Sequence, residues 1–393
     1  MKAKWISAAA FALALWLAGV AAASAASVPA TPAASDPSPG AQVAQTISTV
    51  TGVAISPLLG MSAVGVWQWV KAPAEKRASL PWFARPWFWL PALVLVGLCI
   101  AKDTVGTAAP TVLKKPLDVA EAVEHKISGL VAAGAFVPLV AMVFHSAEPD
   151  HVAVSAAGLA MIDLHPLYNA LMVPVALIAY GIVFLASNAI NVLILLSPFT
   201  TVDAGLKLFR GAVLATVTAT AFSQNPWIGA LWSLAVILLA SLIAGWSFRL
   251  SVLGMVSIWD VLTLRKRRFT PDATANWMFL GRKTEQVPAR TLGKLARDAG
   301  GRLIFQYRPW LVLPSRTLVL PPGAYAVGHG LIWSELVRVE GEEATTAMIL
   351  PPRCRTHEEE MARVYSLNGV RPIGLRALFR WLFGGGQARP VAA

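Results

Sequence analysis

The sequence predicts an α-helical membrane bundle of about five spans with short re-entrant or interfacial helices. A small, mostly β cytoplasmic domain is expected at its C-terminal end. Two observations predict this fold class. Hydrophobic residues make up 56% of the 393 residues and charged residues only 14%, whereas an average soluble domain has roughly 25% charged residues. After Leu264, Gly, Pro and Arg become frequent and the apolar runs shorten. We therefore expect lipid to cover the part of the chain before Leu264.

Residues 1–25 have the three parts of a secretory signal peptide. Lys2 and Lys4 form the positive region, an apolar segment follows, and Ala23-Ser24-Ala25 is a small-x-small cleavage pattern. An uncleaved membrane anchor is the alternative interpretation. Residues 26–46 are rich in Pro, Ala, Ser and Thr. They lack the apolar content to fold and are expected to form a flexible periplasmic linker.

Residues 47–263 are expected to form the transmembrane helical domain, because they contain six apolar stretches. A helix needs roughly 20 apolar residues to cross ~30 Å of hydrocarbon. The third, fourth and sixth stretches meet this length, and the first approaches it. The second and fifth are short, and either is expected to be a re-entrant or half-buried helix. The stretches are 47–70, 87–101, 127–144, 167–196, 212–222 and 227–246.

The distribution of Lys and Arg predicts the orientation, because basic residues beside membrane spans stay in the cytoplasm. The block Arg265, Lys266, Arg267 and Arg268 directly follows the sixth stretch, so it anchors that end of the span inside. The loop at residues 145–165 has no Lys or Arg and is expected outside. The chain is thus predicted in a bacterial inner membrane, with a cytoplasmic C-terminus and, after signal cleavage, a periplasmic N-terminus.

The C-terminal part is predicted to consist of three segments. These are a basic linker at residues 264–284, a small β-rich cytoplasmic domain at 285–370 and a basic amphipathic tail at 371–393. The tail is expected either to dock on the cytoplasmic leaflet or to pack on the β domain. Short strands broken by Pro and Gly predict one small barrel or sandwich. The expected strands are 302–308, 310–313, 316–320, 324–327, 331–340 and 345–350.

Most of the positive charge lies after Thr263, where 20 Lys and Arg face 10 Asp and Glu. A basic domain beside a membrane is suited to the anionic lipids of the cytoplasmic leaflet. The expected partners are the lipid bilayer, anionic lipid and a protein bound at the cytoplasmic domain. Nucleic acid is disfavoured, because the basic residues are scattered and no recognition motif accompanies them.

The predicted periplasmic loop at residues 145–165 is rich in His and acidic side chains. Imidazole and carboxylate groups together can bind a divalent metal or relay protons. Their spacing matches no zinc signature, and Pro149 interrupts any regular helix. The simpler interpretation is a solvated polar loop. The candidates are His145, Glu148, Asp150, His151, Asp163 and His165.

Asn188 and Asn191 lie in the fourth apolar stretch, three residues apart and so on one helix face. Inside lipid such side chains line a pathway or hydrogen-bond to other helices, and the second interpretation is favoured. Cys354 and His357 have a C-x-x-H spacing, but a zinc site needs further ligands that are not nearby. The run Glu358–Glu360 is interpreted as the solvated first turn of a helix. No catalytic, cofactor-binding or metal-ligating residue is predicted.

The sequence lacks the phosphate-binding loop, the H-E-x-x-H motif, the G-x-S-x-G motif and the dinucleotide fingerprint. This disfavours the common enzyme classes. The favoured hypothesis is a non-enzymatic scaffold or regulatory protein with a cytoplasmic interaction domain. A transporter or channel component is the first alternative, and an intramembrane metal-dependent enzyme is the second.

A segment from Ser56 to about Val137 resembles a family of uncharacterised bacterial multi-pass inner-membrane proteins of unknown function. The resemblance covers about a fifth of the chain and leaves out the β region. It implies a membrane fold and supplies no catalytic residues. The features that carry it are Ile55-Ser56-Pro57, Leu80-Pro81-Trp82, Pro86-Trp87, Ala101-Lys102-Asp103 and the segment 115–126.

Overall fold

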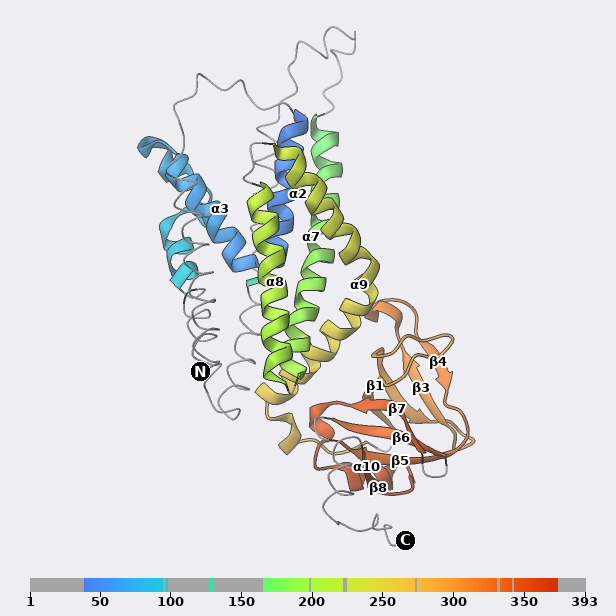
Figure 1. Ribbon diagram of the computed structural model, residues 1–393. Coiled ribbons are helices and arrows are strands. Elements are labelled where there is room, and N and C mark those ends of the chain that lie inside the picture. The colour runs from blue at the N-terminus through green and yellow to red at the C-terminus, as the bar shows by residue number, and fades with distance from the viewer. Residues whose placement is uncertain are drawn as a thin grey trace. The chain divides into compact units, whose positions relative to one another are not determined.

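The computed structural model contains a group of helices and an eight-stranded β-sheet (Figure 1). The chain divides into two compact units, Met1–Ala244 and Gly245–Ala393. The structure describes residues 39–94, 97, 128–129, 165–197, 199–221, 225–272, 274–330, 333–340 and 343–373.

The first unit is helical, and α2 lies at its centre, packed against α3, α7 and α8. Its buried core includes Val53 of α2, Met61 of α3, Val183 of α7 and Val217 of α8. The helix α9 begins in this unit, and its residues from Gly245 onward belong to the second unit. The helices are α2 (Pro39–Ile55), α3 (Pro57–Lys71), α7 (His165–Leu196), α8 (Thr200–Ala221) and α9 (Pro226–Leu262), with short 3₁₀ turns η1 (Ala74–Ser79) and η2 (Trp82–Ala84).

The first predicted apolar stretch is broken into two helices at Ser56. Proline has no N–H to donate and disfavours helical geometry in the residue before it, so the chain turns at Pro57. The carbonyl oxygen of Ile55, near the end of α2, accepts a hydrogen bond of 2.7 Å from Ser187 of α7. The break therefore leaves this buried carbonyl with a side-chain partner on a neighbouring helix.

The prediction of a bundle of about five spans is wrong. Within the described part of the chain, two helical segments are long and apolar enough to cross a membrane, Pro174–Leu196 and Pro226–Leu262. The helix α3 has only 15 residues, and α8 carries Asp203, Lys207 and Arg210, which lower its mean hydropathy. Of the second predicted stretch the structure describes residues 87–94 and 97, and of the third it describes only 128–129. The two apolar helices support an association of the chain with a membrane.

The β region is also larger than predicted, because it is one eight-stranded sheet and not a small barrel or sandwich. The strand order is β4-β3-β2-β1-β7-β6-β5-β8, and every pair is antiparallel except β5 with β8. The strands are β1 (Ala275–Leu280), β2 (Leu292–Arg297), β3 (Leu303–Tyr307), β4 (Arg316–Val319), β5 (Ala324–His329), β6 (Ser334–Glu340), β7 (Glu343–Leu350) and β8 (Val370–Pro372).

Two antiparallel meanders make up seven of the eight strands, and β8 pairs in parallel with β5 at one edge. The strands β1 to β4 form the first and β5 to β7 the second, and they join where Phe279 and Leu280 of β1 pair with β7. Five of the predicted strands coincide with β3 to β7. The strand β1 begins at Ala275, within the range expected to be a linker. Residues 310–313 do not form a strand, because the 3₁₀ turn η4 (Pro309–Leu311) begins there.

The core of the second unit is centred on Tyr365, which is fully buried. Its hydroxyl group donates a hydrogen bond of 2.8 Å to the carbonyl of Leu295 and accepts one of 2.8 Å from the side-chain amide of Asn276. Tyr365 directly follows the short helix α10 (Glu358–Val364), which packs beside β5 and β8. This one side chain thus ties β1 and β2 to the end of α10. Of two further 3₁₀ turns, η3 (Arg265–Arg267) precedes β1 in sequence and η5 (Pro352–Cys354) lies between β7 and α10.

Candidate functional site

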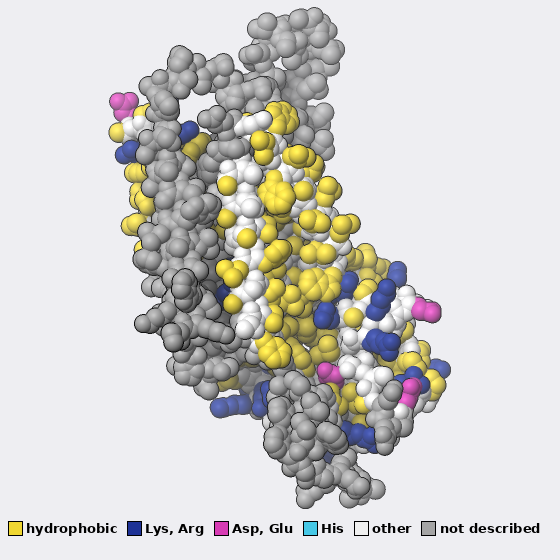
Figure 2. All heavy atoms as spheres, in the orientation of Figure 1, with side chains coloured by type: hydrophobic (Ala, Val, Ile, Leu, Met, Phe, Trp, Pro, Cys, Tyr) yellow, Lys and Arg dark blue, Asp and Glu magenta, His cyan; other side chains and the backbone are white. Residues whose placement is uncertain are grey.

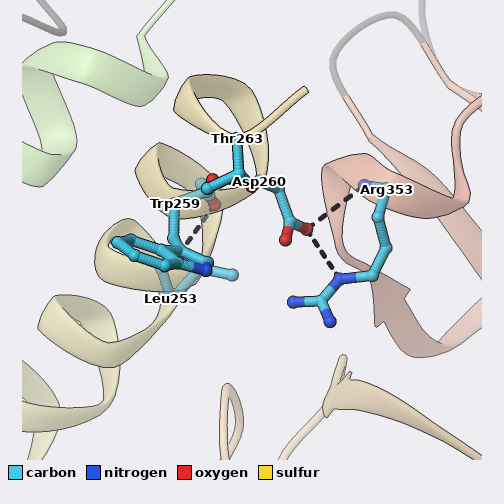
Figure 3. Close-up of polar contacts among 6 residues, drawn as sticks. Leu253, Trp259, Asp260, Thr263 and Arg353 are labelled. Atoms are coloured by element: carbon cyan, nitrogen blue, oxygen red, sulfur yellow. Dashed lines mark hydrogen bonds and ion pairs between the residues drawn. The ribbon is translucent and has the colours of Figure 1, made fainter. Parts of the chain in front are cut away.

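The principal polar site of the second unit is an ion pair between α9 and the turn η5 (Figure 3). Oδ2 of Asp260 lies 2.8 Å from Nε of Arg353 and also accepts a hydrogen bond of 3.2 Å from the Arg353 backbone N–H. The exposed fractions of the two side chains are 1% for Asp260 and 9% for Arg353. A buried carboxylate on the last turn of an apolar helix is therefore neutralised by a guanidinium from the sheet domain.

Charges are removed from water only at a high free-energy cost, so a buried ion pair contributes little net stability compared with apolar side chains of the same size. Removing one partner is different, because the other is left buried and uncompensated, at a cost of about 3–5 kcal/mol. Oδ1 of Asp260 has no hydrogen-bond partner among the described residues. Breaking the pair is therefore expected to cost more stability than the intact pair contributes.

Two further contacts hold α9 and the segment after it to the sheet domain. Nε of Arg249, on α9, donates a hydrogen bond of 3.1 Å to the carbonyl of Ala289. Nε2 of His357 lies 2.9 Å from the carbonyl of Lys266, and because a carbonyl only accepts, this nitrogen must carry the hydrogen. Together with Asp260–Arg353 these contacts form what we call the α9–sheet junction. Its contacts involve α9 near Arg249, the last turn of α9 at Asp260 and the segment after the helix at Lys266.

The predicted basic block follows α9. Its residue Lys266 takes part in the α9–sheet junction through its backbone carbonyl, which is hydrogen-bonded to His357. The block follows Leu264, which has a left-handed backbone with φ of 49°. All four side chains are exposed. The positive charges thus face solvent, and Arg268 also donates a hydrogen bond of 2.7 Å to the carbonyl of Thr263. The four residues are Arg265, Lys266, Arg267 and Arg268.

A second polar cluster was not predicted from the sequence. Oε1 of Glu358 accepts a hydrogen bond of 2.7 Å from the hydroxyl of Ser334 and lies 2.9 Å from Nδ1 of His329. Burial raises the pKa of Glu358, but the hydrogen bonds from Ser334, its own backbone and His329 outweigh burial and hold the pKa below its usual value. The serine donates to the glutamate and not to the histidine, so the cluster lacks the arrangement of a serine nucleophile activated by a base.

The two predicted asparagines are both buried within the helical unit, with exposed fractions of 5% for Asn188 and 7% for Asn191. The side-chain oxygen of Asn191 on α7 accepts a hydrogen bond from the guanidinium of Arg210 on α8. The structure brings these two helices together through a polar pair. Asn191 thus hydrogen-bonds to a neighbouring helix through its side-chain oxygen, and the interpretation of the two asparagines as a pair stays a prediction.

The predicted loop cluster falls largely outside the described residues, which holds for His145, Glu148, Asp150, His151 and Asp163. His165 is the first residue of α7. In the described part, no group of three or more His, Cys, Asp and Glu side chains is placed to hold a metal ion.

The Cys354–His357 pair is not arranged as a reactive or metal-binding site. The thiol of Cys354 is fully buried, and burial raises its pKa to about 12. A thiol with so high a pKa stays protonated at neutral pH and is therefore a poor nucleophile. His357 is engaged with the carbonyl of Lys266 and with Glu360. His357 is therefore part of the α9–sheet junction, and Cys354 is packed in the core of the sheet domain.

Comparison of the chain with models of protein families, with curated proteins and with solved structures finds no match, so the family resemblance of its segment from Ser56 to about Val137 stays a prediction.

Proposed function

We propose that this chain is a non-enzymatic scaffold or regulatory protein of a bacterial inner membrane, whose sheet domain is a cytoplasmic interaction module. The observation that carries the proposal is the buried ion pair between Asp260 and Arg353. A domain on a loose tether needs no buried contact with the helix before it. A domain fixed to that helix keeps a constant orientation beside the membrane, which suits a protein that positions a partner there.

The length of α9 supports this membrane arrangement. Its 37 residues span about 55 Å at 1.5 Å per residue, whereas ~30 Å of hydrocarbon takes only about 20 residues. Residues 227–246 cross the bilayer, and the rest of α9 continues on the cytoplasmic side. The basic block from Arg265 to Arg268 then follows on that side, as the positive-inside rule requires.

The polar pair in the helical unit supports a structural role rather than transport. The side-chain oxygen of Asn191 on α7 accepts a hydrogen bond from the guanidinium of Arg210 on α8. A cation that is partly buried among helices is stabilised by such a partner, since an unpaired charge in lipid is costly. The pairing therefore gives the side-chain oxygen of Asn191 a role in holding α7 to α8.

The interaction module is tested by photo-crosslinking in intact cells with an affinity tag at the C-terminal end. The full chain is expected to capture a specific, saturable protein partner. A matched control ends after Arg268, so it keeps the described helices α2 to α9 and lacks the sheet. Capture of the same proteins by both chains would contradict an interaction role for the sheet domain.

The orientation is tested separately by fusing reporters after Ala393. A green fluorescent protein is expected to fluoresce there, and an alkaline phosphatase is expected to be inactive, because the first matures in the cytoplasm and the second requires the periplasm. An active phosphatase would contradict the cytoplasmic placement.

A further inference from the structure

The second unit contains a cleft lined by four arginines. It has a volume of about 150 Å³ and lies between α9, the segment before β2 and the turn η4 after β3. None of the residues that line it is acidic. Within the described residues, none of the four forms an ion pair with a carboxylate. The arginines are Arg249, Arg290, Arg308 and Arg316.

Four guanidinium groups around one small space repel each other unless an anion lies among them. Planar guanidinium groups present paired N–H donors that match the oxygens of a phosphate. Arg249 is partly fixed by its hydrogen bond to Ala289, while Arg308 and Arg316 are exposed at the rim. A volume of about 150 Å³ has room for several water molecules and therefore for a phosphate group. Its chemistry favours a phosphate monoester or diester as the ligand.

An exposed apolar segment forms one edge of the cleft. Residues 310–313 are Trp, Leu, Val and Leu, with exposed fractions of 50%, 42%, 81% and 46%. Trp310 and Leu311 both have left-handed backbones, with φ of 54° and 66°, a strained geometry for such large side chains. The ring of Trp310 packs on Phe248 of α9, with centroids 4.9 Å apart. A strained, exposed run of apolar residues indicates an interaction surface.

On the sheet region, Figure 2 shows Lys and Arg side chains in dark blue. If residues 227–246 cross the bilayer, Arg249 lies less than one turn beyond the span, at the depth of the lipid headgroups. Trp246, which is also exposed, is typical of this interface. The arginines then lie beside an anionic headgroup. The apolar segment 310–313 lies beside the acyl chains.

We propose that this cleft binds the phosphate headgroup of an anionic phospholipid of the surrounding bilayer, while residues 310–313 enter its apolar region. The site rests on the proposed function in one respect, the placement of the sheet domain beside a membrane. Such binding gives the interaction module a lipid-dependent second attachment to the bilayer.

The test measures how much radiolabelled phosphatidylglycerol the full chain retains after purification in detergent, with phosphatidylcholine as the neutral comparison. The wild type is expected to retain phosphatidylglycerol several-fold better. The double variant R308Q/R316Q is expected to lose this preference. A matched variant, R302Q/R363Q, removes the same charge from exposed arginines outside the cleft and is expected to keep it. Equal retention by R308Q/R316Q and wild type would overturn the proposal.

Two further measurements distinguish a lipid from free phosphate. Val312→Asp places a charge in the apolar segment and is expected to lower retention of phosphatidylglycerol several-fold. A large excess of inorganic phosphate is expected to leave retention unchanged. Displacement by inorganic phosphate together with unchanged retention by Val312→Asp would indicate a free-phosphate site and would overturn the lipid assignment.

Membrane fractionation separates failure of this site from failure of the proposed function. If the wild-type chain sediments with membranes but shows no preference for phosphatidylglycerol, the lipid site alone is contradicted. If the chain is found in the soluble fraction, both the membrane placement and the lipid site are contradicted.

Discussion

Glu358 makes the stability of the sheet domain depend on pH. Its pKa is lower in the folded chain than its ordinary value of 4.5, because hydrogen bonds outweigh the effect of burial. A carboxylate with a lowered folded pKa contributes stability that is fully present above the unfolded pKa and is lost as the pH falls through the folded pKa. The free energy of unfolding is therefore expected to decrease as the pH falls below about 4.5.

Glu358→Gln tests this contribution. The amide keeps a hydrogen-bond acceptor but loses the charge, so we expect about 1–3 kcal/mol less stability at pH 7 and a weaker pH dependence in acid. Urea unfolding of the detergent-solubilised chain at several pH values measures both effects. Glu359 is exposed and adjacent, so Glu359→Gln is the matched control and is expected to change little. An unchanged acid slope in Glu358→Gln would contradict this assignment.

The thiol of Cys354 reports on local opening of the α9–sheet junction. With a pKa of about 12 the thiol is deprotonated in only about one chain in 10⁴ at pH 8. In a Cys99→Ser background, maleimide is expected to label the native chain far more slowly than the urea-unfolded chain. Asp260→Asn is expected to speed labelling of the native chain, because it leaves Arg353 without its carboxylate. Equally rapid labelling of native and unfolded chains would show that Cys354 is accessible.

At the scale of elements, the ion pair between α9 and η5 is suited to a double-mutant cycle. Asp260→Leu alone leaves a buried guanidinium and is expected to reduce the free energy of unfolding by about 3–5 kcal/mol. Adding Arg353→Met removes the uncompensated charge, so much of that stability is expected to return. Thermal or urea unfolding of the full chain measures the free energy of unfolding of the wild type, the two single variants and the double variant. Simply additive losses would mean that the two side chains are not coupled.

The packing of α3 against η2 depends on a glycine. A Cβ atom at Gly65 would lie 2.4 Å from the carbonyl oxygen of Phe83, too close for the backbone to remain in place. Gly65→Ala is expected to destabilise the helical unit by about 1–3 kcal/mol. Gly181 in α7 has open space around it, so Gly181→Ala is the control and is expected to stabilise by about 0.5–1 kcal/mol. Thermal unfolding in detergent compares them, and similar losses in both variants would contradict the packing argument.

At the scale of the whole molecule, the two apolar helices predict how the chain partitions. We expect it to remain with the membrane pellet after alkaline carbonate extraction, because helices such as α7 and α9 are held by hydrocarbon and not by charge. Detergent is expected to release it. Release by carbonate alone would indicate a peripheral protein, whose apolar helices are covered by other protein surfaces.

Some elements follow from local sequence and others do not. The helix α7 and the first half of α9 are long and apolar, and β3 to β7 lie between clear Pro and Gly breaks, so both groups were predictable. The continuation of α9 beyond Trp246 was missed, because Ser247 and Arg249 interrupt the apolar run without ending the helix. The strand β8 has three residues and pairs in parallel with β5, a non-local contact that no local pattern indicates.

The candidate site was less predictable than the fold. Asp260 and Arg353 lie 93 residues apart and meet only through the packing of η5 on α9. Glu358 stands in a run of three glutamates and was interpreted as solvated, yet it is buried while its neighbours are exposed. In both cases charge and spacing were visible in the sequence, but burial, which gives each residue its role, is set by the tertiary structure.

The separation between Asp260 and Arg353 also has a consequence for the order of events during synthesis. A ribosome adds about 5–20 residues per second, so Asp260 precedes its partner by about 5–20 s. During this interval β1 also waits for β7, and Tyr365 has not yet been added to tie β1 to β2. The helices can thus enter a membrane while the sheet is still incomplete. Arrival of the segment that carries Arg353, α10 and β8 then closes the domain onto a helix that is already anchored.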